Sequence, residues 1–195
     1  MRVIAGEAKG RPLKAVPGMN TRPTTDKVKE AVFSMIGPYF EGGWALDLFA
    51  GTGGLGIEAL SRGMEKAVFV DQDRTSIAVV KANVEAAGMS GRAEIYTNDA
   101  GRAVKALAKR GISFAAVFLD PPYRLTHMDA QIMELLERRL LADDAVIVVE
   151  HDAGRAYPEV IGGCEQTRRV QYGETAVTVY RYRPQQTEVA DADGN

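Results

Sequence analysis

The tetrapeptide Asp120-Pro121-Pro122-Tyr123 carries the most specific chemical pattern in the sequence. It follows the apolar run 114–119, which predicts a buried strand. Proline fixes φ and lacks an N–H group, so the Asp120 carboxylate and the Pro121 carbonyl are expected to be held as hydrogen-bond acceptors. Such a pair suits an exocyclic amino group, such as N2 of guanine or N6 of adenine, and Tyr123 can stack on the base. The motif therefore predicts a clamp for a planar amine.

A glycine loop at residues 51–56 follows an earlier apolar run. Gly51, Thr52 and Gly53 at its start predict a tight turn that a nucleotide can approach closely, although a dinucleotide-binding enzyme or a purely structural turn would show the same pattern. Asp47 separates these interpretations, because its carboxylate would repel a pyrophosphate but would attract the sulfonium and ammonium groups of S-adenosylmethionine (SAM). Asp47 could also cap the amides of the turn. SAM is therefore the predicted cofactor, and methyl transfer to a base is the predicted chemistry.

Two further carboxylates follow predicted strands. Asp71 can accept hydrogen bonds from the ribose hydroxyls of a nucleoside that lies across the strand ends, with Asp73 as a nearby, more solvent-facing candidate. Asp99 can accept from the adenine amino group or can cap the helix that follows it, and the sequence leaves both roles open.

Short apolar runs alternate with segments of helical periodicity, which predicts an α/β fold. Strands are expected at 45–49, 67–70, 93–96, 114–119, 145–149, 165–172 and 175–182, and helices at 26–36, 54–62, 74–87, 100–110 and 128–140. The last two strands are joined by Gly173-Glu174 and predict a hairpin. The sequence thus predicts a mainly parallel seven-stranded sheet with a C-terminal antiparallel hairpin, with ligands at the carboxyl ends of the strands.

The length of 195 residues predicts one main domain at 38–183, after an N-terminal basic arm and helix at 1–37 and before a disordered acidic tail at 184–195. Cys164 is the single cysteine, which excludes an intrachain disulfide and a thiolate metal cluster, and no metal is expected. The opening residues lack the apolar stretch of a signal peptide, so we expect a cytoplasmic protein without a membrane partner.

Charge is distributed unevenly along the chain. The net charge is −2, but residues 1–29 hold seven basic and two acidic side chains, a local charge of +5. This asymmetry predicts a basic arm that contacts phosphates, although a solvated surface without a partner would look the same. The candidate nucleic-acid contacts in this arm are Arg2, Lys9, Arg11 and Lys14.

Over about residues 1–183 the chain resembles the bacterial RsmD-like methyltransferases, which modify N2 of a guanine in small-subunit (16S) ribosomal RNA. The resemblance lies in the stretches 2–6, 9–11, 22–33, 47–53 and 120–123. It implies a Rossmann-like SAM-dependent methyltransferase fold, an Asp-Pro-Pro-Tyr motif at the target amine and an N-terminal arm that touches RNA. It also implies that Arg22 and Thr24 lie beside the methionine part of SAM. Gly54 stands where many relatives carry Ala.

The expected function is therefore methyl transfer to guanine N2 in 16S rRNA, within an assembling small subunit and by a monomer. Adenine-N6 methylation of DNA is the near alternative, and the lack of an added target-recognition domain in 195 residues weighs against it. A nicotinamide dehydrogenase would leave Asp120-Pro121-Pro122-Tyr123 unexplained. A non-catalytic RNA-binding module would not require Asp120.

Overall fold

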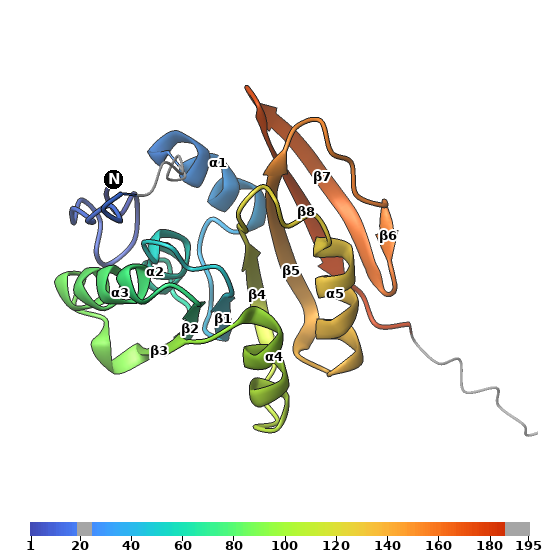
Figure 1. The fold of residues 1–195 in the computed structure, drawn as a ribbon, viewed down its shortest axis with the longest axis horizontal. Coiled ribbons are helices and arrows are strands. Elements are labelled where there is room, and N and C mark those ends of the chain that lie inside the picture. The colour runs from blue at the N-terminus through green and yellow to red at the C-terminus, as the bar shows by residue number, and fades with distance from the viewer. Residues whose placement is uncertain (19–24, 186–195) are drawn as a thin grey trace, which may run out of the picture.

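The computed structural model describes residues 1–18 and 25–185, and these form one sheet flanked by helices (Figure 1). Within the described residues the sheet has eight strands in the order β3-β2-β1-β4-β5-β8-β7-β6. The strands are β1 (Trp44–Asp47), β2 (Lys66–Asp71), β3 (Ala93–Thr97), β4 (Phe114–Leu119), β5 (Leu141–Asp152), β6 (Val160–Ile161), β7 (Cys164–Tyr172) and β8 (Thr175–Tyr182).

The described part of the chain also contains five α-helices and one short 3₁₀ helix, of which the first precedes β1 and the others lie between strands. They are α1 (Asp26–Ile36), α2 (Gly54–Ser61), α3 (Arg74–Ala86), η1 (Ser90–Arg92), α4 (Ala100–Ala108) and α5 (Met128–Glu137). Side chains of Thr25, Asp73 and Asp99 cap the N-termini of α1, α3 and α4, because each accepts a hydrogen bond from the first turn.

The topology confirms the predicted α/β fold. Strands β1 to β5 pair in parallel, while β8 joins β5 in the antiparallel sense and β7 completes the hairpin. The structure adds the two-residue strand β6 at the edge and extends β5 beyond the predicted 145–149. Strand β5 is long because it pairs on one side with β4 and on the other with β8, as far as Asp152 opposite Thr175.

Alternation along the strands separates two core layers. Phe69 and Phe118 pack with the apolar faces of α1, α2 and α3 on one side of the sheet. Val70 and Leu119, their chain neighbours, pack with α4 and α5 on the other side. Successive strand residues point to opposite faces, so a residue two positions beyond Phe69 or Phe118 returns to the α1–α3 side.

The N-terminal segment, residues 1–18, is folded against the body of the protein. Val3, Ala8 and Leu13 are buried in the same core layer as α2 and α3. The regular β-pairing of this segment is limited to a single bridge between Arg2 and Pro12. Most backbone contacts of this segment go instead to other parts of the chain, which explains why it shows no helical or strand periodicity.

Glu58 on α2 anchors this segment. Its buried carboxylate accepts the backbone N–H groups of Ile4 and Ala5 at 3.0 and 3.1 Å. It also lies 3.4 Å from the Lys29 ammonium and 2.9 Å from Nε of Arg62, both of them buried. One carboxylate therefore ties the N-terminal segment to α1 and α2.

We expect Glu58→Ala to lower the free energy of unfolding by about 3–5 kcal/mol, because it leaves two buried cations and two partly buried N–H groups without their acceptor. Urea denaturation measures this loss. The matched control is Glu134→Ala, which removes a partly exposed i,i+4 pair with Arg138 and should cost less than about 1 kcal/mol. Equal losses in the two variants would contradict the anchoring role of Glu58.

Candidate functional site

A cavity of about 950 Å³ lies at the carboxyl edge of the parallel strands. The strand order reverses between β1 and β4, and such a switch point is where open α/β sheets bind ligands. The glycine loop after β1 and the Asp120-Pro121-Pro122-Tyr123 motif after β4 both line this cavity. The two motifs predicted from the sequence therefore share one site.

Asp47 lies at the floor of this cavity, at the end of β1. It is 1% exposed, and its Oδ2 accepts the backbone N–H of Gly56 at 3.0 Å. Burial raises the pKa of Asp47 to about 7, against the Gly56 hydrogen bond, which lowers it, and with a smaller upward contribution from the Asp71 carboxylate. Asp47 thus caps a backbone amide of the turn, which was one of its predicted roles. Its carboxylate changes its charge near neutral pH.

The glycine loop presents backbone to the cavity. Gly51 and Gly53 have φ values of 57° and 81°, a region that side chains with a Cβ rarely adopt. A Cβ on Gly51 would meet nothing within 4 Å, so the space beside it is open to a ligand. Thr52 also lines the cavity, and its hydroxyl accepts the N–H of Gly54 at 3.2 Å. This loop can therefore receive a nucleoside against its backbone.

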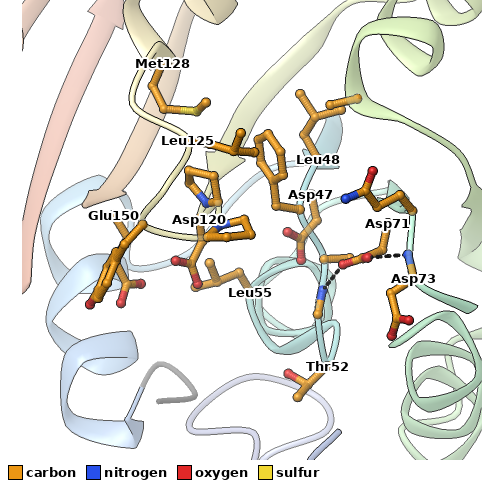
Figure 2. Close-up of a pocket in the computed structure, with 18 of the residues that line it drawn as sticks. Asp47, Leu48, Thr52, Leu55, Asp71, Asp73, Asp120, Leu125, Met128 and Glu150 are labelled. Carbon is orange, nitrogen blue, oxygen red and sulfur yellow. Dashed lines mark hydrogen bonds between the residues drawn. The ribbon is translucent and has the colours of Figure 1, made fainter. Parts of the chain in front are cut away.

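The other acidic candidates combine local and cavity-facing positions. Asp71 accepts the N–H groups of Gly51 and Asp73 at 2.9 Å, one on each carboxylate oxygen (Figure 2). Asp99 accepts from Arg102 N–H as the helix cap that was one of its two predicted roles. Asp71, Asp73 and Asp99 all line the cavity, and every carboxylate oxygen can accept more than one hydrogen bond.

The Asp-Pro-Pro-Tyr motif forms the opposite end of the cavity. Pro121 is buried, and a turn closed by the hydrogen bond from Leu125 N–H to the Pro122 carbonyl, at 2.9 Å, follows it. Tyr123 is 54% exposed, and its hydroxyl lies 2.7 Å from the Thr175 hydroxyl at the start of β8. The C-terminal hairpin therefore fixes an aromatic ring at the rim of the site.

Several residues that line the cavity or hold the glycine loop were missed by the sequence analysis, among them Glu150, Lys29 and Asn83. Glu150 directly follows the predicted strand 145–149 and lines the cavity, so an acid immediately after a strand was the available pattern. Lys29 lines the same cavity from α1, where its periodicity indicates only a helix. Asn83 on α3 donates to the carbonyls of Lys14 and Thr52 and accepts Lys14 N–H, contacts that no local pattern predicts.

The predicted RNA contacts lie on the N-terminal segment. Arg2, Lys9, Arg11 and Lys14 are all exposed, and Arg2 also forms an ion pair with Asp26 at 3.8 Å. Met1, Ala15 and Val16 of the same segment line the cavity. Arg22 and Thr24, implied by resemblance to contact the methionine part of SAM, lie outside the described residues.

Residues 1–18 and 25–185 contain no group of three His, Cys, Asp or Glu side chains that could hold a metal ion. The same part of the chain contains no helix long and apolar enough to cross a membrane.

The model of the family described as Conserved hypothetical protein 95 matches residues 1–181, and the chain is 33% identical over 191 residues to Ribosomal RNA small subunit methyltransferase D of Escherichia coli. The chain belongs to this RsmD-like family. The Escherichia coli match covers 98% of this chain and 94% of the relative. RsmD-like membership agrees with the resemblance carried by the sequence motifs.

Two further comparisons support the RsmD-like assignment. The chain is 52% identical over 183 residues to YlbH of Bacillus subtilis, whose name assigns it provisionally to the rRNA methyltransferases, with 94% of this chain and 100% of the relative covered. The solved structure of Escherichia coli yhhF, provisionally titled a methyltransferase, superposes with a TM-score of 0.79 at 34% identity. That match covers 95% of this chain and 99% of the solved one.

The raised pKa of Asp47 predicts a pH-dependent gain in stability when the carboxylate is removed. The folded protein holds a proton on Asp47 up to about pH 7, whereas the unfolded chain releases it near pH 4, so the contribution of this group to stability falls as pH rises between those values. The free energy of unfolding of Asp47→Asn, relative to that of wild type, should increase by about 2–3 kcal/mol between pH 5 and pH 8. Urea denaturation of the ligand-free proteins at both pH values measures it.

The Asn side chain can still accept the Gly56 N–H, so this variant keeps the turn. The control is Asp143→Asn on the exposed start of β5, which removes a carboxylate that is not buried. A pH-independent difference for Asp47→Asn would contradict the burial argument.

Proposed function

We propose that this protein transfers the methyl group of SAM to the exocyclic N2 of a guanine in small-subunit ribosomal RNA, in the cytoplasm. The observation that carries the proposal is the shared cavity, because the nucleotide-sized glycine loop and the amine clamp line the same space. Membership of a family whose relatives are named as rRNA methyltransferases supports the substrate class.

The cofactor end of the cavity fits SAM by charge and shape. Asp47 provides a buried carboxylate for a cationic ligand, and the open space beside Gly51 admits a nucleoside. Asp71 would accept from the ribose hydroxyls and Asp99 from the adenine amino group, each with oxygen lone pairs not used by the backbone contacts. When bound, SAM would supply a methyl group on a positively charged sulfur. The amine nitrogen would bond to the methyl carbon as the carbon–sulfur bond breaks, so that S-adenosylhomocysteine leaves and the nitrogen loses one proton.

At the acceptor end the chain has to orient a poor nucleophile. The lone pair of an exocyclic amine is delocalised into the ring, and hydrogen bonds from its two protons to the Asp120 carboxylate and the Pro121 carbonyl favour the pyramidal form. Asp120 or a water molecule then takes the proton that is released. Tyr123 stacks on the base, returning roughly 1–3 kcal/mol of the cost of unstacking it. Positioning and electrostatics supply most of the rate.

The defining experiment incubates the protein with labelled SAM and small subunits from cells that lack this enzyme. We expect label on guanine N2 of the small-subunit RNA, at a position that nuclease mapping and mass spectrometry identify. Label only on adenine, or only in DNA, would refute the substrate assignment and would favour the adenine-N6 alternative.

We expect Asp120→Ala to lower kcat by at least about 100-fold while leaving the affinity for S-adenosylhomocysteine within about 3-fold, because Asp120 faces the amine and not the cofactor. Methyl transfer and calorimetric titration measure the two quantities. The control is Asp143→Ala, at the start of β5 and far along that strand from Glu150, which lines the cavity; this variant should match wild type. Unchanged turnover in Asp120→Ala would show that the acceptor site lies elsewhere.

We also propose that the exposed cations of the N-terminal segment bind RNA phosphates. Replacing Arg11 and Lys14 together with Gln should weaken binding to small-subunit RNA and reduce the slope of log K against log salt concentration by about 1–2, since each lost phosphate contact removes about 0.7–0.9. Filter binding at several salt concentrations measures the slope.

The control replaces Lys105 and Lys109 with Gln. These residues lie at the C-terminal end of α4, whereas Ala100 at its N-terminal end lines the cavity. An unaltered slope in the Arg11 and Lys14 variant would leave these side chains as a solvated surface without an RNA role.

A further inference from the structure

A second carboxylate stands next to Asp120. Strands β4 and β5 are parallel neighbours in which Leu119 pairs with Val149, so Asp120 and Glu150 each follow one member of a paired position. Both residues line the cavity, and Glu150 is half-buried. Figure 2 shows the two labelled side chains together on the side of the cavity away from Asp71 and Asp73. The acceptor end therefore holds two adjacent carboxylates.

Glu150 lies at the end of the cavity that we assign to the base and not at the end that we assign to the cofactor. Glu150 and Tyr123 also line a small adjoining hollow, and Thr175, which holds the Tyr123 hydroxyl at 2.7 Å, lies in the strand that pairs with β5. Asp47, which we assign to the cofactor, comes from β1 on the other side of β4. A base stacked on Tyr123 with its amine at Asp120 would bring the neighbouring ring atom towards Glu150.

Guanine and adenine differ at that neighbouring atom. In guanine, the carbon that bears the N2 amine lies between N1, which carries a proton and is a donor, and N3, which carries a lone pair; the N1 edge is the one that would face Glu150. In adenine, the ring atom N1 beside the N6 amine carries a lone pair and is an acceptor. An ionised carboxylate only accepts hydrogen bonds, so two adjacent carboxylates match the adjacent donors of guanine and oppose the lone pair of adenine.

We propose that Glu150 accepts the N1–H of the target base and so selects guanine over adenine. This specificity role rests on the proposed guanine-N2 activity and adds a residue that reads the base, beside the residues that hold the reacting amine. A site that pairs with a substrate donor discriminates strongly against an analogue that lacks it, because the acceptor is then left facing a lone pair.

The test uses small subunits reconstituted around RNA that carries guanine, 2-aminopurine or adenine at the methylated position. 2-Aminopurine keeps the reacting 2-amino group but has a lone pair at N1. Wild type should methylate 2-aminopurine at least about 30-fold less efficiently than guanine, measured as kcat/KM with labelled SAM. Glu150→Ala should lose about 10- to 100-fold on guanine and little on 2-aminopurine.

Glu150→Gln provides the decisive reading. Its amide group can turn an N–H towards the N1 lone pair, so its ratio of 2-aminopurine to guanine methylation should rise at least about 10-fold over wild type. Impaired folding would lower both rates together and could not raise this ratio. Each variant should bind S-adenosylhomocysteine as wild type does, and Asp143→Asn at the far end of β5 should keep the wild-type ratio.

The outcomes separate the two proposals. If wild type methylates guanine but both Glu150 variants keep the wild-type ratio of 2-aminopurine to guanine methylation, the role proposed for Glu150 is refuted. The proposed guanine-N2 activity is then unaffected. If wild type methylates adenine in these particles and not guanine, the proposed function falls and the role of Glu150 falls with it.

Discussion

Parallel pairing of β1, β2, β4 and β5 is the constraint on which the site depends, because parallel strands all end at one edge of the sheet. Strands β1 and β2 end on an acid, β4 is followed by one, and β5 carries one near its end. Each acid lies two residues beyond a side chain of the α1–α3 core layer, and the two-residue period returns it to the same face. Register and periodicity together thus gather four carboxylates around one cavity: Asp47, Asp71, Asp120 and Glu150.

Such a gathering of acids has an energetic consequence. Burial raises the pKa of Asp47 to about 7, with the nearby Asp71 carboxylate adding to the shift, so part of the negative charge is held at the expense of stability. A ligand that brings cationic groups and hydrogen-bond donors would offset the cost of burying the Asp47 carboxylate near that of Asp71. The same electrostatics that weaken the ligand-free protein would therefore favour a sulfonium cofactor and an amine acceptor over anionic ligands such as dinucleotides.

The elements whose residues interact locally or alternate regularly could be predicted from the sequence. Strand β4 and helix α1 have the predicted bounds, and the hairpin of β7 and β8 turns at Gly173-Glu174 as expected. The two chemical motifs were likewise placed at strand ends. The N-terminal segment could not be predicted, because its order comes from Glu58 and Asn83, which lie 53 to 69 residues away in the chain. Glu150 follows the predicted strand 145–149 as Asp120 follows 114–119, but its place beside Asp120 depends on the pairing of β4 with β5, which no local pattern reveals.

The anchoring of the N-terminal segment links the two halves of the proposed function. Lys29 forms an ion pair with Glu58, donates to the Arg2 carbonyl and also lines the cavity. Met1 lines the cavity and lies beside Gly54 of the glycine loop. The segment that presents the exposed cations therefore also borders the cavity in which we propose that the cofactor binds. RNA bound to those cations and a cofactor bound in the cavity would contact the same segment. The affinity for one would therefore depend on whether the other is bound.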